Sequence, residues 1–215
     1  MITPDSVQNL LNSEDYGDRL RAVNQMRGLE DSIAFEFLKK ASQDKNTRVR
    51  YAAVSQMADK GTVNLEESLE LLRDRLLHDP EIDVQAAAAD ALGALKLTQA
   101  FDDIQTVYQN TNEWLVKISI VAALGGMGEP RAINILLDAL KSDNELLQTI
   151  AIGALGELGN REAIPHLIPF VPNPDWQMRY RVAQALKLMG GPEAETALAT
   201  LAQDEVEQVA NEAKR

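Results

Sequence analysis

The sequence predicts an all-α solenoid of about seven two-helix repeats, and three features of the 215-residue chain lead to that prediction. A column of short polar residues, each able to cap a helix, recurs every 31–35 residues. An apolar stripe follows each member of this column, and a glycine lies near the end of several repeats. Periods of this length are typical of stacked helical repeats, in which each unit packs on its neighbours.

The polar column predicts where the second helix of each repeat begins. A side-chain oxygen at a helix start can accept a hydrogen bond from a free backbone N–H, so we expect each member to be an N-cap. Pro80 and Pro174 directly follow two members and would then occupy the first helical position, where a missing N–H costs little. The members of the column are Ser13, Asp44, Asp79, Thr111, Ser142, Asn173 and Asp204.

The apolar stripe of each second helix lies five, nine and thirteen residues after the polar column. These offsets are i, i+4 and i+8, which share one face of a helix. Small residues beside the stripe, such as Ala87, Ala123 and Ala185, would let neighbouring helices approach closely. Glycines four residues past the stripe predict left-handed helix ends. These glycines are Gly61, Gly128, Gly159 and Gly190.

Each second helix is preceded by a first helix with apolar residues three and four apart, such as "DSIAFEFLKKA". Repeat three has extra length, expected near 61–64 and in a longer first helix. Pro165 and Pro169 should kink or shorten the first helix of repeat six. We expect one continuous domain over 1–215, with repeats at about 1–28, 29–61, 62–96, 97–128, 129–159, 160–190 and 191–215.

Composition excludes several functional classes. The formal charge of −12 argues against a broad nucleic-acid surface, which needs lysine and arginine. No apolar run is long enough for a membrane span, and the opening residues lack a secretory pattern, so we expect a cytoplasmic protein. Without cysteine there is no thiol chemistry. His78 and His166 lie in distant repeats, so we assign no catalytic residue, metal ligand or resident cofactor.

The remaining candidate site is the surface of the second helices, which should line the inner, concave curve of the stack. Two short segments there, "RVRY" and "WQMRYR", combine cations with aromatic side chains. Such residues dominate protein-binding hot spots, and arginine also suits carboxylates. The candidate partner- or ligand-binding residues are Arg48, Arg50, Tyr51, Trp114, Lys117, Trp176, Arg179, Tyr180 and Arg181.

A structural role for several of these residues stays open. Arg50, Lys117 and Arg179 lie six residues after the polar column and can pair with an acidic residue of the next repeat, forming an internal ladder. Tyr51 and Tyr180 can pack between repeats, and the two tryptophans can be half-buried at the rim of the stripe.

Several segments, among them "DKNTRVRYAAVSQMADKG" and "SDNELLQTIAIGALGELG", resemble HEAT repeats, and most of all the short, alanine-rich HEAT-like repeats of the phycobilisome lyase group. The resemblance covers essentially the whole chain and implies a right-handed α-superhelix. Within the group, "ITPDSVQNLLNSEDYGDRLRAVNQMR" is similar to members that act in phycobilisome degradation in cyanobacteria.

This resemblance implies phycobiliprotein partners and two possible functions, and a third function stays open that does not depend on it. The first is a non-enzymatic scaffold that binds phycocyanin or allophycocyanin subunits and assists phycobilisome degradation or chromophore removal, with a protease adaptor as a further candidate partner. The alternative is a phycocyanobilin lyase or chromophore-detaching enzyme, in which arginines would hold the propionates of a transient phycocyanobilin and Asp15 would protonate a pyrrole. The third is a scaffold for an unrelated protein partner.

Overall fold

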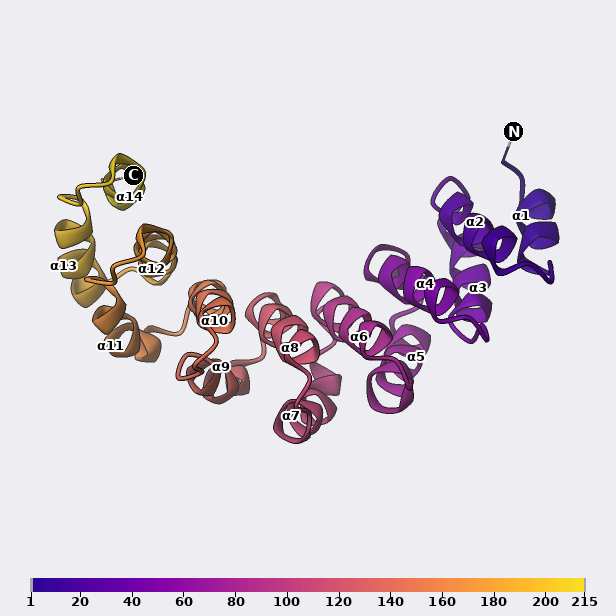
Figure 1. Cartoon of the computed structure of the whole chain (residues 1–215), viewed down its shortest axis with the longest axis horizontal. Coiled ribbons are helices and arrows are strands. Elements are labelled where there is room, and N and C mark those ends of the chain that lie inside the picture. The colour runs from indigo at the N-terminus through magenta and orange to yellow at the C-terminus, as the bar shows by residue number, and fades with distance from the viewer. Residues whose placement is uncertain (1, 215) are drawn as a thin grey trace. The chain divides into compact units, whose positions relative to one another are not determined.

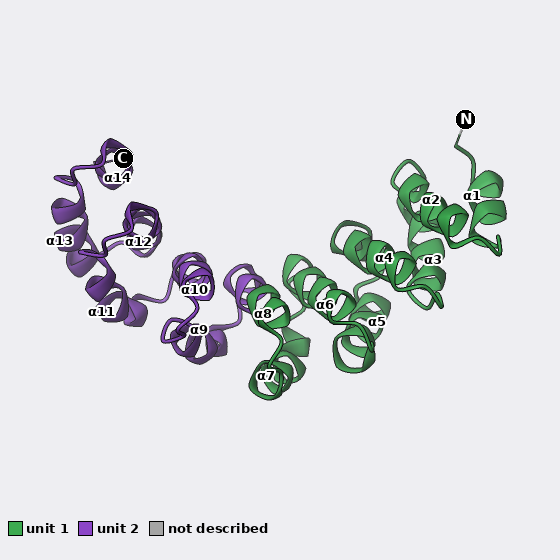
Figure 2. Cartoon of the chain, viewed as in Figure 1, with its two compact units in different colours: residues 1–120 green, residues 121–215 purple. Residues whose placement is uncertain are grey.

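The computed structural model describes residues 2–214, and all regular structure in that range is helical (Figure 1). It comprises fourteen α-helices and five short 3-10 helices, which confirms the predicted all-α class. The chain divides into two compact units, Met1–Ile120 and Val121–Arg215, and the boundary falls inside one helix (Figure 2). The expectation of one continuous domain stays a prediction.

The N-terminal unit is built from helical hairpins. In each hairpin a first helix packs on the second helix that follows it, as in the pairs α1–α2, α3–α4 and α5–α6, and the second helices α2, α4 and α6 contact one another in order. Its elements are α1 (Pro4–Leu11), α2 (Tyr16–Met26), α3 (Asp31–Ala41), α4 (Thr47–Lys60), η1 (Gly61–Val63), α5 (Leu65–His78), α6 (Ile82–Ala94), η2 (Thr98–Ala100), α7 (Phe101–Asn110) and the start of α8 (Trp114–Met127).

The C-terminal unit repeats the same arrangement. The second helices α10, α12 and α14 contact one another in order, while α9, α11 and α13 each pack on the second helix of their own repeat. After the end of α8 its elements are η3 (Pro130–Ala132), α9 (Ile133–Ala139), α10 (Glu145–Leu158), η4 (Arg161–Ala163), α11 (Ile164–Leu167), η5 (Ile168–Phe170), α12 (Trp176–Met189), α13 (Pro192–Leu201) and α14 (Glu207–Lys214).

The polar column has the predicted period but does not cap the helices. In all seven repeats the second helix begins three residues after the column, and the column side chain accepts a hydrogen bond from the backbone N–H two residues on. Asp44, for example, accepts from Asn46 at 2.8 Å, and Asn46 is the N-cap. Short polar side chains suit both roles. Pro80 and Pro174 therefore lie in the turn and not in the helix.

The apolar stripe forms the core, as predicted. Val49, Val84 and Val116 are fully buried. Neighbouring second helices approach closely at small residues: a Cβ on Gly156 of α10 would lie 2.7 Å from the Cα of Ala185 in α12. This close contact confirms the expected role of Ala185.

The glycine prediction is right in three repeats and wrong in one. Gly128, Gly159 and Gly190 have φ of 79°, 69° and 61°. Gly61 instead has φ of −64° and continues into η1. Its requirement is space, because a Cβ there would lie 2.6 Å from Leu95 Cδ1 and 2.9 Å from Ser68 Oγ.

The two irregular repeats also match their predictions. Repeat three contains the additional η1 and a first helix, α5, of 14 residues. In repeat six, α11 is only four residues long and passes into η5, with Pro165 and Pro169 near the start of each segment. Proline cannot donate an interior helical hydrogen bond, which explains the short elements.

Candidate functional site

Three arginines form buried ion pairs between the turns that precede neighbouring second helices, and we call these pairs the ladder. Arg50 Nε and Nη2 donate to the two carboxylate oxygens of Asp79, both at 2.9 Å, and Nη1 donates to the carbonyl of Asp44 at 3.0 Å. The exposed fractions of the two side chains are 9% and 0%. Each arginine thus joins its own turn to the turn of the next repeat. The three rungs are Arg19–Asp44, Arg50–Asp79 and Arg179–Asp204.

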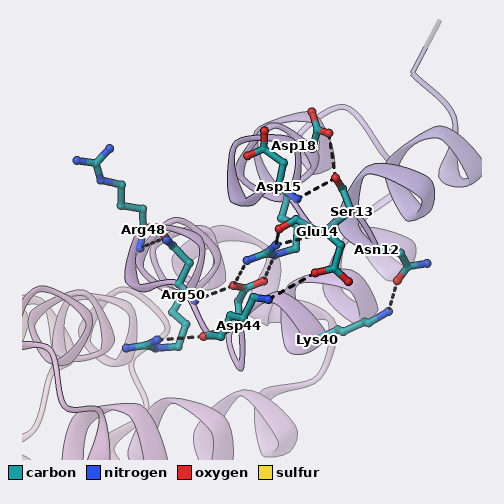
Figure 3. A network of polar contacts seen from close by, with 12 residues as sticks. Asn12, Ser13, Glu14, Asp15, Asp18, Lys40, Asp44, Arg48 and Arg50 are labelled. Carbon is teal, nitrogen blue, oxygen red and sulfur yellow. Dashed lines mark hydrogen bonds and ion pairs between the residues drawn. The ribbon is translucent and has the colours of Figure 1, made fainter.

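The ladder keeps its carboxylates ionised. Burial by itself raises the pKa of Asp44 and Asp79, but hydrogen bonds from the arginines and from backbone N–H groups outweigh it, so both pKa values lie below the usual range. The hydrogen bond from Arg179 is the main cause of the lowered pKa of Asp204. Figure 3 shows Asp44 in the polar network of the N-terminal repeats, and the side chain of Arg48 extending away from that network.

The ladder corrects part of the predicted binding site. Arg50 and Arg179 were expected on an exposed surface, but both are buried and fully engaged, as the alternative prediction of an inter-repeat ladder required. Lys117, in the same column, is half-buried with its ammonium 5.2 Å from the ring centroid of Tyr108. Arg50 and Arg179 are therefore not available to a partner, while Lys117 keeps part of its surface exposed.

The other predicted residues do lie on the surface, and most of them border a groove. Arg48 and Tyr51 line a groove of about 360 Å³ over α4, α6 and the start of α8, which we call the N-terminal groove. Tyr51 is 48% exposed, so it does not pack between repeats. The lining residues are Thr47, Arg48, Tyr51, Asp83, Ala86, Ala87, Asp90, Leu115 and Ser119.

The N-terminal groove carries charges of both signs over an apolar floor. Arg48 has no acidic partner among the described residues, while Asp90 accepts a hydrogen bond from Ser119 Oγ at 3.2 Å. Although Asp90 keeps exposed area, the groove walls exclude part of the water around its carboxylate and raise its pKa, which the Ser119 hydrogen bond partly offsets. The groove can therefore offer a guanidinium, a carboxyl group and an aromatic ring to one ligand.

Trp176, Tyr180 and Arg181 line a second groove, of about 580 Å³, over α10, α12 and α14, which we call the C-terminal groove. Trp176 is 40% exposed and Tyr180 is half-buried. Trp114 is 59% exposed but does not line either groove. The residues that line the C-terminal groove are Thr149, Trp176, Gln177, Tyr180, Arg181, Gln184 and Gln208.

Several groove residues were missed by the sequence analysis. They lie four, eight and eleven residues after the polar column, on the side of each second helix that is turned away from the centre of the apolar stripe. A helical projection of each repeat would have found them, and would have placed the offset of six at the edge of the stripe. The missed residues that carry polar chemistry are Asp83, Asp90, Ser119, Gln177, Gln184 and Gln208.

Two other kinds of site are not found in the part of the chain that the structure describes. No group of three or more histidine and carboxylate side chains in residues 2–214 is arranged to hold a metal ion. No described helix is long and apolar enough to cross a membrane.

Comparisons of sequence and structure relate the chain to known proteins built from helical repeats. The chain is 38% identical over 80 residues to phycocyanobilin lyase subunit alpha of Picosynechococcus sp., an alignment that spans 34% of this chain and 30% of that protein. A chain in the solved complex of CpcE and CpcF of phycocyanin lyase from Nostoc sp. shares the fold. The TM-score is 0.67 and the identity 21%, and the match covers 100% of this chain and 94% of that chain.

An archaeal HEAT-like repeats protein from Thermococcus onnurineus is similar in the same way, with a TM-score of 0.61, 13% identity, and coverage of 100% and 95%. The family model of HEAT repeats matches residues 3–81, 69–152 and 135–214, which together include nearly all of the sequence. These matches, together with the helical hairpins described above, show that the chain belongs to the HEAT-repeat family.

Proposed function

We propose that this HEAT-repeat chain acts on phycobiliproteins and binds a bilin while the bilin is attached to or removed from a subunit. The similarity to phycocyanobilin lyase subunit alpha carries this proposal, because it is a sequence relationship of 38% identity and not a likeness of fold alone. The solved phycocyanin lyase supports the repeat architecture. Since that structure is a complex of CpcE with CpcF, we expect full activity to require a second repeat chain.

The N-terminal groove has side chains suited to a bilin as substrate. The unpaired Arg48 can take a propionate carboxylate, and the exposed ring of Tyr51 can stack on a pyrrole. Asp90, held by Ser119, can accept a pyrrole N–H as a carboxylate or donate a proton as an acid. Asp15, which the sequence suggested for this role, caps α2 and does not line the groove.

A non-enzymatic scaffold is the second candidate. The opening of the chain resembles the phycobilisome-degradation protein called non-bleaching protein B, and Tyr51, Trp114 and Trp176 are exposed aromatic side chains of the kind that anchor protein partners. In this function the chain would hold a phycocyanin or allophycocyanin subunit in the cytoplasm, favour the dissociated antenna by mass action, and present the subunit to a protease adaptor.

One experiment separates these functions. The immobilised chain is incubated with purified phycocyanin or allophycocyanin, or with apo-subunits and free phycocyanobilin, in the presence and absence of a lyase partner chain. Retained protein is quantified, and bilin absorbance after denaturation reports covalent attachment. Altered pigment supports the lyase-type function, whereas retention with unaltered pigment supports the scaffold. If no phycobiliprotein is retained and no pigment changes, both functions are rejected.

Matched variants locate the site. The double substitution Arg48→Ala and Tyr51→Ala removes two exposed side chains of the N-terminal groove, so we expect at least tenfold weaker binding or turnover with little change in melting temperature. Arg21→Ala is the control, because Arg21 is exposed and only pairs with Asp18 on its own helix. Equal losses in the control would show that the effect is not specific to the groove.

A further inference from the structure

The lining of the C-terminal groove contrasts with the net negative charge of the chain. The chain contains 33 acidic and 21 basic residues, yet no carboxylate lines this groove. Glu145 and Glu207 begin the flanking helices α10 and α14 but lie outside the lining. The single charged group in its lining is the guanidinium of Arg181, which also lines an adjoining cavity with Glu157, Lys187 and Glu212.

Arg181 is an unsatisfied cation. Among the described residues it has no ion pair, and its one side-chain hydrogen bond runs from Nη1 to Gln184 Oε1 at 3.1 Å. Two residues earlier on the same helix, Arg179 is buried against Asp204. Gln184 also donates from Nε2 to Tyr180 OH at 3.3 Å, so it holds Arg181 and Tyr180 side by side. The remaining N–H groups of Arg181 form a fork suited to a carboxylate.

The other polar groups of the groove suit a peptide backbone. Gln177 and Gln184 are seven residues apart on α12 and therefore share one face, and Gln208 lies across the groove on α14. Each side-chain amide offers both donors and an acceptor, and every non-proline peptide unit offers one of each. Trp176 and Tyr180, four residues apart, add aromatic surface for apolar side chains along the same strip.

We propose that the C-terminal groove binds an extended, acidic peptide segment of a partner protein, with Arg181 taking a glutamate or aspartate carboxylate. The side-chain amides of Gln177 and Gln184 are two helical turns apart on α12. This spacing favours a ligand with several peptide groups over a single small acid. The N-terminal groove is less suited to a peptide backbone, because no side-chain amide lines it. The C-terminal groove is therefore separate from the N-terminal groove, and the proposal does not depend on the partner's being a phycobiliprotein.

Fluorescence anisotropy with synthetic peptides tests the proposal on the full chain. The probe is a short labelled peptide of alternating glutamate and valine, blocked at both ends, and its matched control carries glutamine in place of glutamate. We expect the acidic peptide to bind at least tenfold more tightly than the control. Arg181→Gln should weaken acidic-peptide binding about tenfold, the loss of one charge-assisted hydrogen bond, and leave the glutamine peptide unaffected.

Arg21→Gln is the matched control variant. Arg21 lies eight residues after its turn residue, as Arg181 does, and is similarly exposed, but it is already paired with Asp18. We expect wild-type peptide affinity for this variant and wild-type melting temperatures for both. Equal binding of the two peptides, or an unchanged affinity in Arg181→Gln, would overturn the proposal. Displacement of the peptide by free glutarate or biliverdin at the same concentration would also overturn it, since the site would then recognise small acids.

Discussion

Arg50→Ala gives the sharpest test of the buried ladder. The substitution removes both 2.9 Å hydrogen bonds to Asp79 and the 3.0 Å bond to the Asp44 carbonyl. The carboxylate that remains is completely buried. Breaking a buried ion pair by removing one partner costs about 3–5 kcal/mol, because the surviving charge has lost both water and its partner.

The remaining contacts of Asp79 place the expected loss at the lower end of that range. Arg75 Nη1 lies 3.2 Å from the carboxylate, and the Glu81 N–H donates to it at 3.1 Å, so the charge is not left alone. We therefore expect Arg50→Ala to lower the free energy of unfolding by about 3 kcal/mol. Arg21→Ala, at an exposed pair, should cost less than about 1 kcal/mol.

Urea unfolding followed by circular dichroism measures both values, and a double-mutant cycle isolates the pair. In the Asp79→Asn background the carboxylate is gone, so Arg50→Ala should cost clearly less than in the wild type. Repeat arrays can unfold in parts, and hydrogen exchange of α4 and α6 amides supplies a local readout. A loss below about 1 kcal/mol, with no coupling in the cycle, would refute the ladder as a stabilising element.

Three further predictions concern stability. The three ladder carboxylates have lowered pKa values in the folded state, so the unfolded chain binds more protons in acid and stability is lost as the pH falls through those values. Melting temperatures measured from pH 7 downward should therefore fall less steeply in a variant in which asparagine replaces all three aspartates. Gly156→Ala should cost about 1–3 kcal/mol in urea unfolding, because its Cβ would lie 2.7 Å from Ala185 Cα. Gly153→Ala should instead stabilise α10 by about 0.5–1 kcal/mol, because its Cβ would meet no atom of a neighbouring helix within 4 Å. Equal effects of the two substitutions would contradict the close approach at Gly156. Leu124→Asp places a charge at a fully buried position and should reduce the helical circular dichroism signal, and normal stability in that variant would disprove the repeat register.

The turns show how a correct period can carry a wrong structural assignment. The polar column was predicted to cap the second helices, yet each member accepts a hydrogen bond from the backbone N–H two residues later. The N-cap of α4 is Asn46 and that of α12 is Asp175. Serine, threonine, aspartate and asparagine accept backbone hydrogen bonds in both arrangements, so the residue type alone does not separate them. The position of the first helical residue relative to the column decides between the two.

The residue types at two sequence positions mark the rungs of the ladder. Arginine six residues after the column occurs where the column residue of the next repeat is aspartate, as in Arg19 with Asp44 and Arg179 with Asp204. Where that arginine is replaced by Gln85, the next column residue is Thr111. A guanidinium needs a carboxylate partner if it is to be buried, and a neutral amide does not.

The amino-acid sequence by itself determined the all-α class, the repeat period, the apolar stripe and three of the four glycine helix ends, because these depend on the geometry of a single helix and its caps. The tertiary structure decided which cations face outward. Arg48 and Arg181 line grooves, while Arg50 and Arg179, two residues away on the same helices, reach carboxylates of the next turn. Two residues on a helix point about 200° apart, so the packing of one repeat on the next assigned one arginine of each pair to the ladder and left the other to solvent.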